Sequence, residues 1–214
     1  MPTVYGVNAS PFVRKVRVAL AEKGVAYDLE PVIPVNVSDE FRRMSPLGKI
    51  PAFRDGDHVL SDSSIICAYL EKKHPEPALY PADPYQHARA LWFEEYGDTA
   101  LATVIGPKIF FQRIVGPAFF NRPTEEAIVT KAVDEELPPL FDYLEKELSG
   151  PCIAGPAFSI GDIGIATQFV NLRLAGYEVD ASRWPRLAAY AAATHERPSF
   201  AALIKEEKAS FGQA

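Results

Sequence analysis

Two stretches of the chain place polar side chains where a helix is predicted to begin. In the first, Ser10 precedes Pro11, and apolar residues then recur at helical spacing until Gly24 supplies a stop. In the second, Asp62 and Ser63 precede another apolar helical pattern. A helix start offers free backbone N–H groups and the positive end of the helix dipole, so it is a ready anion site. These side chains could therefore serve in ligand chemistry, or they could act as caps alone.

Basic residues gather in the same part of the chain. The first 80 residues carry 10 Lys+Arg and 10 Asp+Glu, so the whole net charge of −6 resides in the remainder. Local basic clusters in this segment suit a small anionic ligand, and the alternative is that most of them are solvated surface charges. The two clusters consist of Arg14, Lys15 and Arg17, and of Arg42, Arg43 and Lys49.

Composition excludes several other classes of protein. The net charge of −6 and the pI of about 5.3 argue against nucleic acid as the main partner. No apolar run reaches the ~18 residues that would span a membrane, and the first residues lack the pattern of a signal peptide, so we expect a cytoplasmic protein. Cys67 and Cys152 lie far apart and the four histidines stand singly, so neither a disulfide framework nor a metal site is expected.

The order of predicted elements divides the chain into two halves. A strand at 3–7, the helix that starts at Ser10, and a strand at 26–33 come first, and the unit lacks the Gly-rich turn of a nucleotide-binding unit. A loop with a short helix follows, then a hairpin with Asp55-Gly56 in its turn, and the helix that starts at Asp62. Residues 74–84 carry four prolines and predict a linker. Helical patterns then cover about 86–115, 124–149, 160–176 and 184–195, with a last piece after Pro198.

One motif in the second half has a purely structural interpretation. Ser159 and Asp162 stand three residues apart, directly before an apolar helical face. This spacing is that of a capping box, with aspartate where glutamate or glutamine is more usual. We therefore predict that both residues cap a buried helix.

Five motifs in this order and spacing resemble the cytosolic glutathione transferase family, of the serine type, over essentially the whole chain. They are "SPFVRKVRVALAEKG" (10–24), "SPLGKIPAF" (45–53), "LSDSSIICAYL" (60–70), "LYPADP" (79–84) and "FSIGDIGIA" (158–166). The resemblance implies an α/β thioredoxin-like domain at 1–78, which binds glutathione. It further implies an all-α domain at 86–214, which contributes the hydrophobic substrate site.

The resemblance also implies which residues bind glutathione. Pro51 would follow a cis peptide bond that turns the backbone of Ile50 toward the cysteinyl part of the ligand, although a rigid loop proline is the simpler alternative. Asp62 and Ser63 would hold the γ-glutamyl end, and the shorter arm of Asp62 replaces the more usual Glu or Gln. Lys49 could meet the glycine carboxylate, or it could be a solvated surface lysine.

The role implied for Ser10 is to donate a hydrogen bond to the thiolate of glutathione. Helix N-termini lower thiol pKa values, and a hydroxyl donor adds to that effect. Tyr5 is the competing candidate, because a first-strand tyrosine serves in other classes of the family. The absence of cysteine at this position argues against the cysteine classes, and Cys67 is expected to be buried and inert.

The second substrate would lie between the two domains, with Phe12, Phe110 and Phe111 as candidates for an apolar wall, or as ordinary packing residues. The function so implied is conjugation of the glutathione thiolate to hydrophobic electrophiles by a homodimer. Glutathione is the co-substrate, no metal takes part, and neither nucleic acid nor a membrane is a partner. The alternatives are a glutathione-dependent isomerase or dehalogenase, and a non-enzymatic glutathione-binding or interaction protein of the same fold. The isomerase class usually shows a serine-cysteine cluster at the first helix, which "NASPFVRK" lacks.

Overall fold

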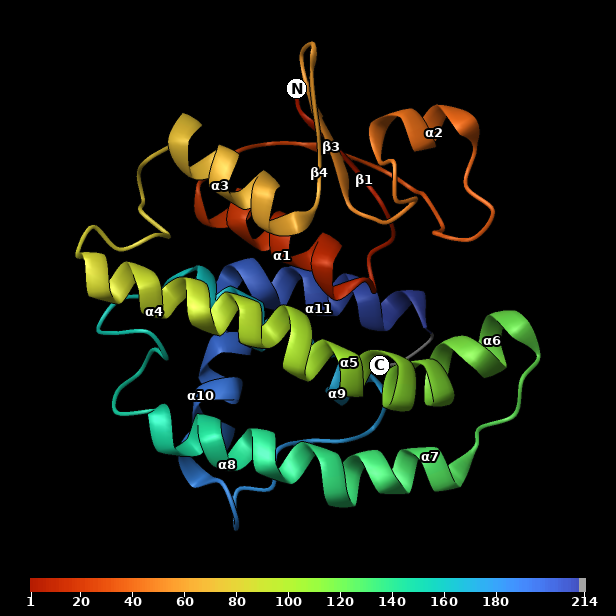
Figure 1. Cartoon of the computed structure of the whole chain (residues 1–214), viewed down its shortest axis with the longest axis vertical. Coiled ribbons are helices and arrows are strands. Elements are labelled where there is room, and N and C mark those ends of the chain that lie inside the picture. Colours follow the sequence, from red (N-terminus) through yellow and green to blue (C-terminus); the bar gives the residue numbers. More distant parts are fainter. Residues whose placement is uncertain (212–214) are drawn as a thin grey trace. The chain divides into compact units, whose positions relative to one another are not determined.

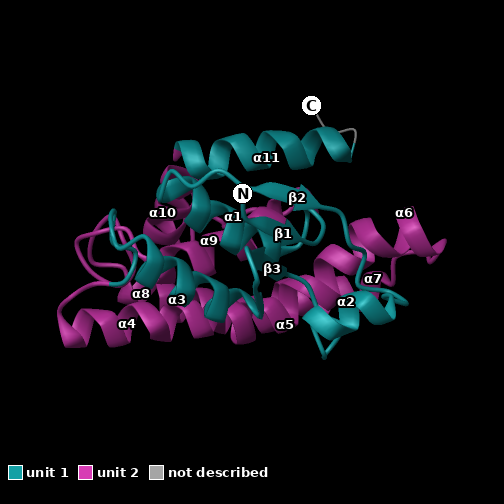
Figure 2. Cartoon of the chain, turned by 90° about the horizontal axis from the view of Figure 1, so that it is seen from above, with its two compact units in different colours: residues 1–80, 198–214 teal, residues 81–197 magenta. Residues whose placement is uncertain are grey.

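A computed structural model describes residues 1–211, and the chain forms two compact units (Figure 2). Unit 1 comprises residues 1–80 together with the C-terminal segment from Pro198, and unit 2 comprises residues 81–197. The boundary at 80/81 falls inside the proline-rich stretch. The last helix joins the first unit, which the order of the motifs along the chain does not indicate.

Unit 1 is built on a four-stranded sheet. Its strands are β1 (Thr3–Tyr5), β2 (Asp28–Glu30), β3 (Ala52–Asp55) and β4 (His58–Ser61), in the order β2-β1-β3-β4. β1 and β2 are parallel, whereas β3 is antiparallel to both β1 and β4. The β3–β4 hairpin turns at Gly56, whose φ of +59° lies in the left-handed region that glycine adopts without strain. The predicted hairpin is therefore confirmed, while the predicted strand at 26–33 shrinks to three residues.

Four helices complete unit 1: α1 (Pro11–Glu22), α2 (Asp39–Met44), α3 (Ser63–Lys73) and α11 (Pro198–Ser210). α1 contacts both α3 and α11 (Figure 1). Ser10 and Asp62 are the N-caps of α1 and α3, as predicted. Gly24 ends the first of these helices with a φ of +64°.

The basic residues of α1 are buried, not solvated. Arg14 is fully buried and donates from Nε to both carboxylate oxygens of Glu207 on α11, at 2.8 and 3.0 Å. Lys15 is also fully buried and donates to Ser64 Oγ at 2.9 Å, while Arg17 is 5% exposed and pairs with α11 as well. The interpretation of these three residues as solvated surface charges is therefore wrong. Their side chains are buried and bind partners that lie up to 193 residues away in the sequence.

The regular elements of unit 2, over residues 81–197, are all helices, joined by loops. A first helical run extends through α4 (Pro84–Glu95), η1 (Tyr96–Leu101), α5 (Ala102–Val104), η2 (Ile105–Val115) and α6 (Gly116–Phe120). A second run comprises α7 (Glu126–Lys131), η3 (Ala132–Glu136) and α8 (Leu137–Glu147), and α9 (Ile160–Leu174) and α10 (Pro185–His195) follow. The η segments have the wider hydrogen-bonding pattern of a π-helix, which often marks functional sites.

α9 is buried along nearly its whole length, and its start is fixed by the predicted capping box. Asp162 Oδ2 accepts from the backbone N–H and the hydroxyl of Ser159, at 2.8 and 3.0 Å. Its other oxygen accepts from Ile153 N–H and from the hydroxyl of Tyr190. Burial raises the pKa of Asp162, and these four donors oppose that shift. The motif therefore has the structural role that its spacing predicts.

Glycines let α9 approach the first helical run backbone to backbone. A Cβ atom added at Gly97 would lie 2.4 Å from the carbonyl oxygen of Gly164, and one at Gly161 would lie 2.9 Å from the carbonyl oxygen of Ala90. Real Cβ atoms do not approach backbone this closely, so a side chain there would force the helices apart. Gly106 lies further along the same helical run and has no heavy atom within 4 Å of such a Cβ.

The surroundings of Gly97 and Gly106 predict opposite effects of substitution by alanine. Gly97→Ala should destabilise the protein by about 1–3 kcal/mol, because the added methyl overlaps the α9 backbone. Gly106→Ala should stabilise it by up to about 1 kcal/mol, because alanine has the higher helix propensity and the site is open. Urea unfolding of both variants measures the free energies. Equal effects at the two positions would contradict close backbone packing of α4–η1 on α9.

Candidate functional site

The register of the sheet aligns three chain segments at one edge. Tyr5 pairs with Ala52, and Ala52 pairs with Ser61. These three residues end β1, begin β3 and end β4, so the next residues beyond them, Pro51 and Asp62, leave the sheet on the same side. α3 starts directly after Asp62, and α1 starts shortly after β1. The sheet thereby brings the starts of two helices to one edge.

Contacts within unit 1 show that these segments lie close together. A Cβ atom added at Gly6 would lie 3.3 Å from Cβ of Ile50 and 2.4 Å from a methyl carbon of Val13. The loop after β1, the residue before Pro51 and the first turn of α1 are therefore in mutual contact. The 2.9 Å bond from Lys15 Nζ to Ser64 Oγ links α1 to the first turn of α3. Lys15 stood in a predicted basic cluster, but nothing in the sequence singled it out.

Ser10 caps α1 with a hydrogen bond that leaves its proton unused. Its Oγ accepts from the backbone N–H of Val13 at 3.4 Å, which is a long hydrogen bond. Accepting this bond occupies a lone pair of the hydroxyl, so the O–H remains able to donate to another partner. Ser10 is half-buried. It can therefore cap the helix and serve as a donor at the same time.

The loop before β3 holds three of the residues predicted to bind glutathione. The Ile50–Pro51 peptide bond is cis, as the resemblance implies, and Pro51 is buried. Lys49 is exposed, and its backbone oxygen accepts from Ser45 Oγ at 2.7 Å. A second cis bond, Glu76–Pro77, was not predicted and lies in the proline-rich stretch.

Asp62 and Ser63 differ in how they meet the solvent. Asp62 is exposed, and its Oδ1 accepts from the N–H groups of Ser64 and Ile65 at 2.9 and 3.3 Å. Its φ of +79° is a left-handed conformation that costs a non-glycine residue about 1–3 kcal/mol and is found at functional sites. Ser63 is 3% exposed at the first position of the helix. The sequence predicted the cap but gave no sign of this backbone conformation.

The arrangement is electropositive, and Lys49 is an exposed cation in the loop before β3. Two helix N-termini supply partial positive charge, and the buried amino group of Lys15 lies beside the second. An anionic group at α3 and a thiolate at α1 would both be stabilised here. Asp62 adds one exposed carboxylate that could meet an ammonium. This combination fits a small ligand that carries both signs of charge.

The three aromatic residues predicted to contact the hydrophobic substrate belong to different units. Phe12 lies half-buried on α1 of unit 1. Phe110 and Phe111 lie on η2 of unit 2, where Phe110 is 6% exposed and the ring of Phe111 stands 5.9 Å from that of Phe120. A role for them in binding a hydrophobic substrate stays a prediction.

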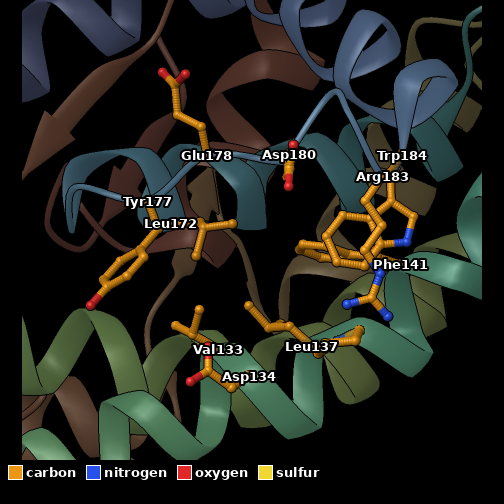
Figure 3. A pocket seen from close by; sticks show the side chains of 11 residues that line it. Val133, Asp134, Leu137, Phe141, Leu172, Tyr177, Glu178, Asp180, Arg183 and Trp184 are labelled. Atoms are coloured by element: carbon orange, nitrogen blue, oxygen red, sulfur yellow. The ribbon is translucent and has the colours of Figure 1, made fainter.

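A separate cavity of about 270 Å³ lies wholly in unit 2 (Figure 3). Its apolar side chains include Leu137, Phe141 and Trp184, while Asp134 and Arg183 contribute charged groups. None of the predicted site residues lines this cavity. It therefore does not correspond to the predicted glutathione site.

Neither cysteine is fully exposed to solvent. Cys67 is 1% exposed on α3, as predicted. Burial, with a contribution from Asp162, raises the pKa of Cys152 to about 11. Within residues 1–211, no three His, Cys, Asp or Glu side chains are grouped so that they could hold a metal ion. No helix in that range is both long and apolar enough to cross a membrane.

Two family models match the chain. The model for the glutathione S-transferase N-terminal domain matches residues 4–78, and the model for the glutathione S-transferase C-terminal domain matches residues 126–193. The first match contains every predicted glutathione-binding residue and Ser10. Together the two matches cover more than half of the chain.

Three relatives illustrate the range of named proteins that the chain resembles. Glutathione S-transferase Z1 of Arabidopsis thaliana is 28% identical over 96% of this chain and 92% of its own length. A stringent starvation protein A homolog of Pasteurella multocida is 29% identical over 92% and 87%. A probable maleylacetoacetate isomerase 1 of Drosophila melanogaster is 37% identical over 41% and 38%.

The fold agrees with these matches. A solved glutathione S-transferase from Rhodospirillum rubrum superposes with a TM-score of 0.87 at 24% identity, covering 95% of this chain and 91% of that one. Its likeness bears on the fold alone. The expected thioredoxin-like domain followed by an all-helical domain is thus confirmed, and the chain belongs to the glutathione S-transferase family.

Proposed function

We propose that the protein binds glutathione in unit 1 and transfers its thiolate to a hydrophobic electrophile, forming a thioether. The observation that carries this proposal is the convergence of the starts of α1 and α3, and of the Ile50–Pro51 cis bond, at one sheet edge. Family membership supports glutathione as the co-substrate. Binding two reactants side by side and holding one as the nucleophile accounts for rate enhancement without a metal.

Glutathione carries two carboxylates, one ammonium and one thiol, and the site offers a partner for each. The start of α3, with Ser63 and the buried amino group of Lys15 nearby, suits the γ-glutamyl carboxylate. Asp62 faces solvent and suits the γ-glutamyl ammonium. The backbone of Ile50 suits the cysteinyl amide, and exposed Lys49 suits the glycine carboxylate.

Ser10 then meets the sulfur at the start of α1. A free thiol has a pKa of about 8.5 and is mostly protonated at neutral pH. The helix N-terminus favours the thiolate, and a hydrogen bond from the Ser10 hydroxyl favours it further. Ser10 acts as a donor throughout and forms no covalent bond. Phe12, Phe110 and Phe111 remain our candidates for contact with the apolar electrophile.

Glutathione-dependent isomerisation is the second candidate, because an alignment of 94 residues, which covers 41% of this chain, matches a probable maleylacetoacetate isomerase. In that reaction the thiol adds to the substrate and leaves again, so glutathione is regenerated. Retention on a glutathione resin tests binding first. Incubation with a generic aryl halide and chromatography of the products then separates a thioether product from unchanged glutathione. A protein that neither binds the resin nor forms a thioether would be a non-enzymatic member of the family.

We also propose that two copies of the chain associate, as the family resemblance implies. A closed two-fold dimer would sediment as one species of twice the 23.6 kDa chain mass at micromolar concentration. Analytical ultracentrifugation checks this. A single species at the monomer mass would contradict the proposal.

Ser63→Ala tests the glutathione site apart from the chemistry. Loss of a hydrogen bond to a charged carboxylate should weaken glutathione binding by about 1.5–3 kcal/mol. Titration calorimetry with glutathione measures the affinity, and the thermal midpoint of the free variant shows whether the fold is intact. Unchanged affinity would remove Ser63 from the site.

Ser10→Ala separates the cap from the donor. Loss of the cap should cost about 1 kcal/mol of stability at every pH. Loss of the donor should raise the pKa of bound glutathione, so kcat/KM should fall far more at about pH 6.5 than at about pH 9, where the thiolate forms without help. Glutathione affinity should change little, because Ile50, Asp62 and Ser63 provide most of the binding.

The control for this experiment is Tyr5→Phe, which removes the competing hydroxyl at the end of β1. Its pH profile should match that of the parent. Parallel profiles for Ser10→Ala and the parent, with equal apparent pKa values, would rule out the donor role. A shift in Tyr5→Phe alone would assign that role to Tyr5.

A further inference from the structure

The last helix of the chain reaches the turn that leads to Ser10. Glu206 on α11 accepts from Asn8 Nδ2 through Oε1 at 2.7 Å, and from Arg17 through Oε2 at 2.7 Å. The Arg17 guanidinium also donates to Asn8 Oδ1 at 3.1 Å. Each of these three side chains therefore contacts the other two, and all three belong to unit 1. Asn8, Arg17 and Glu206 thus form a triad, the Asn8 triad.

Asn8 occupies the tight turn between β1 and α1. The N–H of Ser10 donates to the carbonyl of Val7 at 3.1 Å, which closes the turn around residues 8 and 9. The side chain of Asn8 joins this turn to α11, because its Nδ2 lies 2.7 Å from Glu206 Oε1, within ordinary hydrogen-bond distance. Fixing Asn8 thus restrains the backbone two residues before Ser10.

The remaining contacts make this restraint stiff. Arg17 is only 5% exposed, and its Nε donates to the hydroxyl of Tyr27 at 2.7 Å, so the guanidinium is held on three sides. Hydrogen bonds that involve an ionised partner are stronger than neutral ones. The buried Arg14–Glu207 pair anchors the next residue of α11. Glu206 is accordingly presented to Asn8 from a fixed support.

We propose that the Asn8 triad positions the Ser10 hydroxyl toward the glutathione sulfur, so that α11 is a working part of thiol activation. Asn8 and Glu206 are positioning residues, because they act through Ser10 and meet no ligand. The inference rests on the proposed function. It adds Glu206, which lies in the last helix, 196 positions after Ser10. The alternative is that the triad only holds α11 against α1.

An exchange of groups tests the triad while keeping its charge. Asn8→Asp places a carboxylate beside Glu206, so like charges replace a hydrogen bond and the turn should loosen. Asn8→Asp combined with Glu206→Gln reverses the donor and acceptor. The new amide nitrogen can donate to the new carboxylate, and both positions still accept from Arg17. All three contacts are then possible again at the original net charge.

The first readout needs no activity. Backbone amide hydrogen exchange of ligand-free protein should be at least about tenfold faster at Ser10 and Val13 in Asn8→Asp, because the turn opens more often. The doubly substituted protein should return to the parent rate. Asn121→Asp is the matched control, since it makes the same chemical change at an exposed position of unit 2. It should leave exchange at Ser10 and Val13 unchanged.

The second readout is the pH profile of kcat/KM. Asn8→Asp should lower it about fivefold or more near pH 6.5 and less than twofold near pH 9, with little change in KM for glutathione, because a misplaced donor raises the thiol pKa. The double substitution should restore the profile. In a Ser10→Ala background, Asn8→Asp should cause no further shift, because its effect passes through Ser10.

The outcomes separate the inference from the proposed function. Unchanged exchange in Asn8→Asp overturns the triad as a restraint, whatever the protein catalyses. Faster exchange with an unchanged pH profile in an active parent leaves a structural contact and overturns the positioning role. An additive shift in the Ser10→Ala background does the same. A parent that binds no glutathione overturns the proposed function and with it the catalytic role, while the exchange data still decide whether α11 holds the turn.

Discussion

The pairing of Tyr5 with Ala52, and of Ala52 with Ser61, is the constraint on which the candidate site depends. A slip of one residue in either ladder would reverse which side chains face the core and would carry Pro51 or Asp62 away from the common edge. The strands have only three or four residues, so few ladder hydrogen bonds fix their register. Burial of Val4, Ala52 and Phe53 holds it instead. The starts of α1 and α3 converge because this register ends β1 and β4 at the same edge of the sheet.

The buried charges of α1 show why a helix cannot be interpreted from its own sequence alone. Arg14 is fully buried and would be costly without a partner, since removing one member of a buried pair costs about 3–5 kcal/mol. Glu207 supplies that partner, and burial raises the pKa of this carboxyl although Arg14 opposes the shift. The first and last helices of the chain are therefore matched to one another electrostatically. This matching explains why α11 belongs to unit 1.

Local rules recovered the features that depend on neighbouring residues. The caps of α1 and α3, the glycine at the β3–β4 turn and the capping box of α9 each follow from a few adjacent side chains, and the structure has them all. Features that depend on residues distant in the sequence could not be predicted from local patterns. The acidic residues that pair with Arg14 and Arg17 are Glu207 and Glu206, and the left-handed backbone of Asp62 stands between the hairpin and the helix that it joins. The resemblance, not the pattern, supplied the cis bond before Pro51.

In the proposed function, the hydroxyl of Ser10 has both a structural and a chemical role. Its lone pair accepts from the N–H of Val13, which is a contribution to stability that does not depend on pH in the neutral range. Its proton is free to serve a thiolate, and that contribution matters only while the thiol would otherwise stay protonated. A helix start suits both roles for the same reason, because unsatisfied N–H groups attract any lone pair or negative charge. The cap fixes where the oxygen lies, and in our proposal the turn held through Asn8 fixes the backbone that carries it. Placement of the donor is thereby determined by the fold before any ligand binds.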